Sequence, residues 1–186
     1  MKKKSFQTVK EYFYWIYSNM SMAHVALKNE HKEYEKLDYM IRAKLYKGLN
    51  QGTQHITSIY DDEKYKLNHV QCAYCGKTGK LTLDHLISRK NGGSDSSDNL
   101  VYACRECNSS KNDTDLIVWC FSNNRFPPIL VLRRYLKLAY ESFEENDYLE
   151  LPYEKFSLCC NIFHLDLLPY EFPFCLLYTS PSPRDA

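Results

Sequence analysis

Several long stretches of the chain repeat apolar residues every three or four positions, the spacing of an amphipathic helix. Residues 8–27 form the first stretch, with an aromatic-rich apolar face, and residues 33–47 form the second, which we expect to stop at Gly48. The same spacing predicts three further helices, over residues 58–67, 115–121 and 129–143. The chain is therefore expected to be mainly helical on both sides of a central region of different character.

The central region has short apolar stretches separated by turn-forming residues. Residues 80–86 alternate apolar and polar side chains, which predicts a short strand. We expect a loop, a second strand and a helix to follow, over residues 88–98, 99–103 and 105–111. A unit of this size has too little apolar surface to be stable alone, and the whole chain is expected to have an α+β fold.

Two Cys-x2-Cys pairs enclose this central unit. Cys72 and Cys75 form the first pair, and Cys104 and Cys107 form the second, with 28 residues between the two pairs. Four thiolates with this spacing are typical of a closed structural Zn²⁺ site, with sulfur atoms about 2.3 Å from the ion. A redox dithiol is the alternative, but it needs only one pair. Zinc binding would add folding free energy on the order of 10 kcal/mol.

Composition limits where the chain works. With 44% hydrophobic residues the chain can form a core, and no apolar run of 18 residues predicts a membrane-spanning helix. The basic residues 2–4 precede no apolar segment of the kind found in signal peptides. Because zinc-binding thiols must stay reduced, we expect a cytoplasmic protein, of a prokaryotic or phage-infected cell.

The near-neutral net charge of +1 hides an uneven distribution of charge. Residues 1–140 hold 22 Lys and Arg against 14 Asp and Glu, whereas residues 141–186 hold 2 against 9. A basic body suits a polyanionic partner. The charge becomes evidence for a binding surface only where it gathers near the candidate catalytic residues.

Residues 72–111, CAYCGKTGKLTLDHLISRKNGGSDSSDNLVYACRECNSSK, resemble the HNH endonucleases, and among them the members with four zinc-binding cysteines. The resemblance covers about 40 of the 186 residues and implies a ββα-metal fold. It places Asp84 at the first ligand position for a catalytic metal, His85 at the general base, Asn99 at the residue that braces the loop, and Asn108 at the last ligand position. Asn108 replaces the final His of the family name, as in some active members.

Oxygen ligands from Asp84 and Asn108 favour a hard catalytic ion, Mg²⁺ or Mn²⁺, over Zn²⁺. With a usual pKa of about 6.5, His85 is mostly neutral at pH 7 and is suited to take a proton from water. The resemblance therefore implies metal-dependent hydrolysis of DNA to 5′-phosphate and 3′-hydroxyl ends. Residues expected to contact the phosphates are Arg89, Lys90, Lys111, Arg133 and Arg134.

Two other functions use the same residues. A zinc-stabilised nucleic-acid-binding module with an inactive site is one alternative, although a binder has no need for the combination of Asp84, His85 and Asn108. A nuclease that acts on RNA is the other. Restriction, phage-packaging, homing and defence members of the family all use this unit, so a phage or mobile-element origin is compatible with it and the biological role stays open.

The expected organisation has four parts. Residues 1–70 are a helical N-terminal region, 71–115 the nuclease core, and 116–174 a helical C-terminal region that ends in a short docked tail. Residues 175–186, CLLYTSPSPRDA, resemble the translation of a sequencing adapter, so we expect the natural sequence to differ beyond about residue 174. Cys159 and Cys160 have no partner pair and are not expected to bind a second metal.

Overall fold

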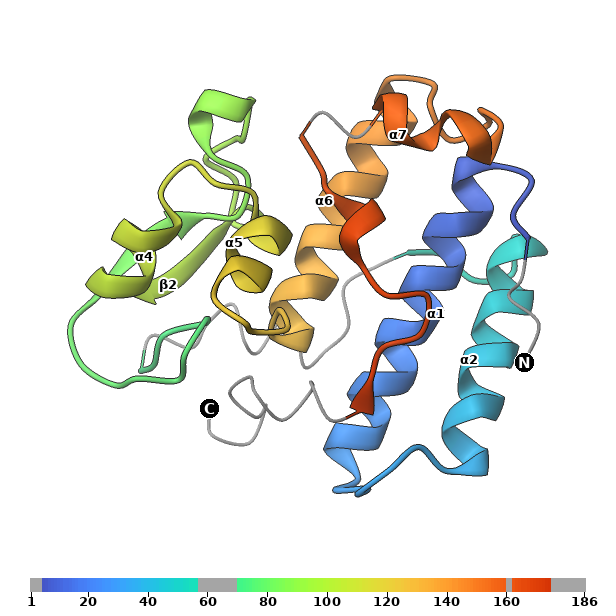
Figure 1. Ribbon diagram of the computed structural model, residues 1–186, viewed down its shortest axis with the longest axis horizontal. Coiled ribbons are helices and arrows are strands. Elements are labelled where there is room, and N and C mark those ends of the chain that lie inside the picture. Colours follow the sequence, from blue (N-terminus) through green and yellow to red (C-terminus); the bar gives the residue numbers. More distant parts are fainter. Residues whose placement is uncertain (1–4, 57–69, 160–161, 175–186) are drawn as a thin grey trace.

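The computed structural model describes residues 5–56, 70–159 and 162–174 (Figure 1). The helix expected over residues 58–67, Cys160 and the adapter-like segment 175–186 lie outside the described residues. Within the described ranges no helix is long and apolar enough to cross a membrane.

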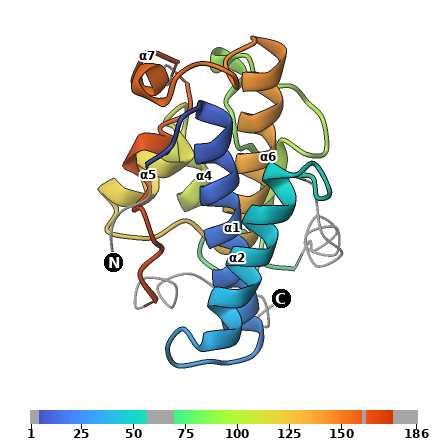
Figure 2. The ribbon, with the colours of Figure 1, turned by 90° about the vertical axis from the view of Figure 1, so that its right-hand side faces the viewer.

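Three long helices form a layered frame: α1 (Val9–Lys28), α2 (Lys36–Asn50) and α6 (Ile129–Glu145). α1 packs against both of the others, and α2 is the outermost of the three (Figures 1 and 2). α1 begins after Thr8, whose hydroxyl accepts a hydrogen bond from the Glu11 amide at 3.2 Å and so caps the helix. The aromatic face expected on α1 is buried here, where Phe13 meets Phe143 of α6 edge to face at 5.0 Å.

The expected stop of the second helix at Gly48 is wrong, because α2 continues to Asn50. Gly48 is instead a point of close packing. A Cβ atom at this position would lie 2.6 Å from Cγ of Gln54, in the chain that turns back against the helix. The turn itself uses Gly52, whose φ of +69° falls in the left-handed region that glycine adopts readily.

The central unit has the predicted strand, loop, strand and helix. β1 (Leu81–His85) pairs antiparallel with β2 (Leu100–Cys104), and α4 (Arg105–Lys111) follows directly and packs on both strands. The register sets Asp84 opposite Val101 and His85 opposite Leu100. The α+β class and the ββα arrangement are thereby confirmed.

α6 lies between the ββα unit and α1, and it holds the loop that joins the two strands (Figure 1). The Arg134 guanidinium donates to the carbonyl of Leu100 at 2.7 Å and to the carbonyl of Ser97. The Lys137 ammonium pairs with Asp98 at 2.9 Å. α5 (Leu116–Ser122) connects the unit to this frame, so the loop between the strands is fixed from outside as well as from within.

The chain after α6 forms short helical turns and then runs back over α1. The turns are η2 (Tyr153–Lys155), α7 (Phe156–Cys159) and η3 (Leu165–Leu167). Tyr12 donates to the carbonyl of Leu165 at 2.9 Å, and the Trp15 indole donates to the carbonyl of Tyr170 at 2.7 Å. These buried donors attach residues 162–174 to the frame, as expected for a docked tail.

Candidate active site and metal centre

The four cysteines of the two Cys-x2-Cys pairs meet at one end of the ββα unit. Their sulfur atoms all lie within 4.8 Å of one another, and the sulfur atoms of Cys75 and Cys104 are 3.8 Å apart. Sulfur atoms held about 2.3 Å from one tetrahedral ion would be about 3.8 Å apart. A hydrogen bond of 2.7 Å from the Ala73 amide to the Tyr102 carbonyl brings the two pairs together. The donor set and its geometry fit a structural Zn²⁺.

Four cysteine side chains this close together favour a bound cation once they ionise to thiolates. The hydrogen bond between the two side chains lowers the pKa of Cys72 to about 4 and raises the pKa of Cys107 well above its usual value. One thiol therefore ionises easily, but a second thiolate is strongly disfavoured while no positive charge is present. A divalent ion removes this penalty, because thiolates and not thiols are the ligands.

Asp84 is buried between β1 and α4. Its Oδ2 atom accepts a hydrogen bond from the Tyr74 hydroxyl at 2.6 Å and lies 3.3 Å from the Lys111 ammonium. Burial, with the charge of Asp84 beside it, raises the pKa of Tyr74 well above its usual value, so the phenol stays a donor. No described residue donates to Asp84 Oδ1, which is therefore the oxygen left for a cation.

Asn108 lies on the face of α4 that meets β1. Its amide nitrogen donates to the Thr82 hydroxyl at 2.9 Å and to the Leu83 carbonyl at 3.2 Å, which turns its amide oxygen away from the strand. Thr82 and Asp84 share one face of β1, and Asn108 and Lys111 are three residues apart on α4. The two residues expected as oxygen ligands therefore come from facing surfaces of strand and helix, and carboxylate and amide oxygens are the donors that a hard divalent ion such as Mg²⁺ or Mn²⁺ prefers.

His85 ends β1 with its side chain 21% exposed. Its Nε2 atom lies 2.7 Å from Oδ1 of Asp95, in the loop between the strands. Arg89 holds the same carboxylate oxygen, with Nε and Nη2 each at 2.8 Å. The hydrogen bond from His85, followed by the one from Arg89, lowers the pKa of Asp95 below its usual value. The ring is thus oriented by an ionised carboxylate and remains accessible.

Asn99 braces the loop at its base. Its Oδ1 accepts from the Ile87 amide at 2.8 Å, and its Nδ2 donates to the carbonyls of Ile87 and Ser94, at 2.9 and 2.8 Å. Gly93 is required beside it, because a Cβ atom there would lie 1.8 Å from the Ile87 carbonyl oxygen. The adjacent Gly92 turns the chain with φ of +85°.

The structure corrects three of the expected phosphate contacts. Lys111 is fully buried and also donates to the His85 carbonyl at 2.6 Å. Arg134 is buried against the loop, and Arg133 is buried against α1, with its guanidinium 4.8 Å from the ring centre of Tyr17. The spacing of Arg133 and Arg134 along α6 predicts an exposed polar face, because sequence spacing does not reveal that other segments cover this face. These three cations hold the fold together and do not present charge to a ligand.

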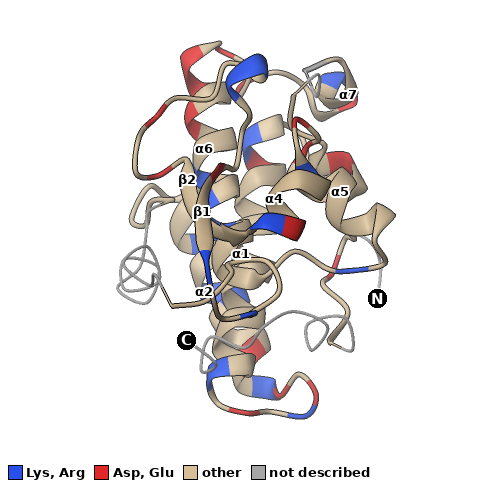
Figure 3. Ribbon diagram, turned by 90° about the vertical axis from the view of Figure 1, so that its left-hand side faces the viewer, with Lys and Arg blue, Asp and Glu red and all other residues tan. Residues whose placement is uncertain are grey.

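Arg89 and Lys90 are exposed on the short turn η1 (Arg89–Asn91), close in sequence to His85. Over the face that carries β1, β2 and α4, basic and acidic residues are interspersed (Figure 3). The excess of basic residues in the first 140 positions is therefore not gathered into one patch on this face. These two remain proposed contacts for nucleic acid.

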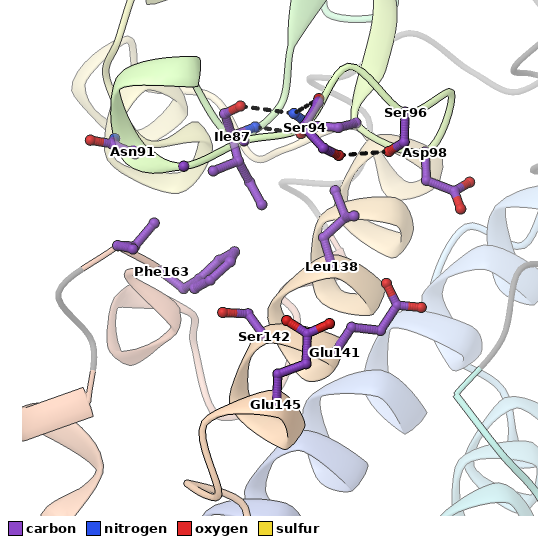
Figure 4. Close-up of a pocket in the computed structure, with 14 residues that line it drawn as sticks. Ile87, Asn91, Ser94, Ser96, Asp98, Leu138, Glu141, Ser142, Glu145 and Phe163 are labelled. Carbon is purple, nitrogen blue, oxygen red and sulfur yellow. Dashed lines mark hydrogen bonds between the residues drawn. The ribbon is translucent and has the colours of Figure 1, made fainter.

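A cavity of about 320 Å³ lies behind the loop, between it and α6 (Figure 4). Ser94, Ser96 and Asp98 line it from the loop, and Glu141 and Glu145 line it from α6. Its acidic lining repels phosphate groups. This cavity is therefore unsuited to a polyanionic substrate.

Residues 72–114, which include both cysteine pairs and every residue of the site described above, match the family model described as HNH endonuclease. They form an HNH endonuclease domain. A stretch of 73 residues is 32% identical to the CRISPR-associated endonuclease Cas9 of Corynebacterium diphtheriae, covering 37% of this chain and 7% of that protein. The chain thus spans a small fraction of the length of this relative. No solved structure matches the chain.

Sequence reasoning missed two residues around the site of the HNH domain, Tyr74 and Asp95, and gave Lys111 a different role. Tyr74 and Lys111 partner Asp84, and Asp95 partners His85. Tyr74 lies inside the first Cys-x2-Cys pair, where only the cysteines gave a signal. The loop contains two aspartates, and nothing in the sequence indicates which one faces the histidine.

Proposed function

We propose that this chain is a metal-dependent endonuclease that hydrolyses DNA phosphodiester bonds to 5′-phosphate and 3′-hydroxyl ends. The observation that carries the proposal is the arrangement around the end of β1. There the accessible imidazole of His85 follows the carboxylate of Asp84, and Asn108 faces the same strand from α4, within an HNH endonuclease domain.

Each residue has a distinct part in the proposed reaction. His85 is the general base that takes a proton from the attacking water. Asp84 Oδ1 and the Asn108 amide oxygen would hold a divalent ion, which supplies positive charge to the phosphate oxygens and the leaving group when it is bound. Tyr74 and Lys111 hold the Asp84 carboxylate in place. Asn99 keeps the loop closed over this end of the strand.

DNA is proposed as the substrate because the resemblance of residues 72–111 to the HNH endonucleases implies hydrolysis of DNA, and residues 72–114 match the model of that family. Arg89 and Lys90 would contact phosphates, which fixes the position of the nucleic acid without reading its sequence. Binding should therefore depend little on sequence.

The test is cleavage of supercoiled plasmid, linear duplex DNA and structured RNA by the purified chain, with Mg²⁺, with Mn²⁺ and with excess chelator. The proposal predicts metal-dependent nicking of the plasmid. The nick should be sealed by a DNA ligase without prior treatment, because ligation needs a 5′-phosphate beside a 3′-hydroxyl. Cleavage of RNA but not of DNA would show that RNA is the substrate. Binding of nucleic acid without cleavage under any divalent ion would favour the inactive binding module.

A further inference from the structure

The side chain of Asp95 has one polar neighbour that matters for chemistry, the imidazole of His85. The 2.7 Å separation between Asp95 Oδ1 and His85 Nε2 is that of a strong hydrogen bond. An ionised carboxylate can only accept, so the hydrogen lies on Nε2 of the ring. The neutral ring then has its lone pair on Nδ1.

We propose that Asp95 is a positioning residue for His85, which fixes the hydrogen of the neutral ring on Nε2 and leaves Nδ1 as the nitrogen that accepts the proton of water. The inference rests on the proposed function, in which His85 is the general base. In that step the water oxygen forms its bond to phosphorus, its proton passes to Nδ1, and the 3′ oxygen leaves with the electron pair of the broken bond. Asp95 does not touch the reacting atoms.

Asp95 is itself held in one orientation. Arg89 donates to the same oxygen from Nε at 2.8 Å, and its Nη2 lies 2.8 Å from that oxygen, while the carboxylate stays 64% exposed. Oδ1 is thus held between the His85 imidazole and the Arg89 guanidinium, and a hydrogen bond from a charged donor is stronger than one between neutral groups. The His85 ring is therefore aligned by a pair of side chains from its own loop and not by a single mobile acid.

The loop brings Asp95 to this place through the Asn99 brace. Asn99 Nδ2 holds the carbonyl of Ser94, the residue directly before Asp95, at 2.8 Å. The Ser94 hydroxyl donates to the Ser96 hydroxyl, directly after Asp95, at 2.9 Å. The contacts on either side fix the backbone that carries the carboxylate. Asn99 is therefore connected to His85 through Asp95.

The second aspartate of the loop serves a different purpose. Asp98 pairs with Lys137 of α6 at 2.9 Å, which attaches the loop to the helical frame. Asp95 has no such partner in the frame among the described residues, and both of its partners lie in the ββα unit. An exposed carboxylate at this place also repels the phosphates of a substrate. An Asp95 carboxylate without a role in the site would only weaken binding of the substrate. Alignment of the His85 ring gives the carboxylate a function that offsets this repulsion.

The test uses the whole chain loaded with zinc and compares Asp95→Ala with wild type. Asp113→Ala is the control, because it removes the same charge from an exposed residue of the same domain that does not contact His85. Nitrogen chemical shifts of [¹⁵N]histidine-labelled protein at alkaline pH report which ring nitrogen carries the hydrogen. The signals of His85 are assigned by their loss in His85→Ala. Plasmid nicking provides kcat and KM.

Wild type and Asp113→Ala should both show the hydrogen on Nε2, and Asp95→Ala should show a mixture of the two neutral forms. The kcat of Asp95→Ala should fall by about 10²-fold, the scale expected when a catalytic group is misplaced by about 1 Å. Its KM should stay the same or fall, because a repelling charge is gone. Zinc content should not change, and the protein should stay folded under the assay conditions. Asp95→Glu should recover part of the kcat.

Two results would overturn the inference. One is a His85 hydrogen on Nδ1 in wild type. The other is an identical distribution of the hydrogen in Asp95→Ala and wild type, whether or not kcat falls. If the hydrogen shifts in Asp95→Ala but wild type cleaves nothing, the positioning of His85 by Asp95 stands and the proposed nuclease function fails. The nitrogen spectra therefore separate the two failures.

Discussion

The Lys111 ammonium lies 3.3 Å from Asp84 Oδ2, and the two side chains are 0% and 7% exposed. This buried ion pair sits at the junction of β1 and α4, where the proposed catalytic ion would bind. A buried pair contributes little net stability, but removal of one partner leaves an uncompensated charge. Lys111 therefore holds the Asp84 carboxylate in place through Oδ2 without occupying its other oxygen.

Replacement of Lys111 by Met should lower the free energy of unfolding by about 3–5 kcal/mol, because Asp84 would remain buried without its cation. Lys90→Met is the matched control and should change it by less than about 0.5 kcal/mol, since Lys90 is exposed. Urea denaturation of both variants measures the difference. Equal stability of the two variants would show that the Lys111–Asp84 pair does not form.

The zinc account predicts about one zinc ion per chain and its loss in Cys107→Ser or Cys72→Ser. Both substitutions should destabilise the ββα unit strongly, because metal binding and folding are coupled. Cys120→Ala is the control, since Cys120 is buried outside the cluster. Elemental analysis and thermal unfolding before and after chelation provide the measurement. A zinc-free protein as stable as the loaded one would contradict the account.

Substitution by Met should affect stability at Arg134 and DNA binding at Arg89. Loss of Arg134 removes two hydrogen bonds to loop carbonyls and should cost about 2 kcal/mol of stability. Loss of Arg89, which is exposed, should instead reduce the dependence of DNA affinity on salt, by about one unit in the slope of log K against log salt concentration. A reduced salt dependence of DNA affinity in a folded Arg134→Met protein would show that Arg134 contacts DNA after all.

The Asp95 carboxyl should titrate below the usual Asp value of about 3.9, because His85 and Arg89 stabilise its charged form. A lowered pKa in the folded state means that its contribution to stability is present above the unfolded value and is lost as the pH falls through the folded one. Carbon NMR of the carboxyl group measures this. In Arg89→Met and in His85→Ala the pKa should move back up, and no movement in either variant would exclude these two partners.

The sequence was informative where a residue acts through its local pattern. Alternation of apolar and polar residues identified β1, and cysteine spacing identified a cluster whose sulfur atoms do meet. These features depend on neighbours close in the chain. The ββα unit and its metal centre could therefore be predicted together.

The sequence was misleading where burial depends on a distant segment. Arg133 and Arg134 lie on a face of α6 that looks polar, yet α1 and the loop of the ββα unit cover it. Gly48 reads as a helix stop until the return of the chain at Gln54 is known. Which of Asp95 and Asp98 contacts His85 likewise depends on the position of α6, because Lys137 of that helix forms an ion pair with Asp98.

The central claim is that His85 is the general base of an endonuclease, and the comparison of wild type with His85→Ala tests it most directly. Plasmid nicking should be measured at matched protein concentration with Mg²⁺ and with Mn²⁺, beside zinc content, unfolding midpoint and DNA affinity. The account predicts nicking by wild type and its loss in His85→Ala, with the other three properties retained, because a partly exposed imidazole contributes little to packing. Equal nicking rates for the two proteins would contradict it.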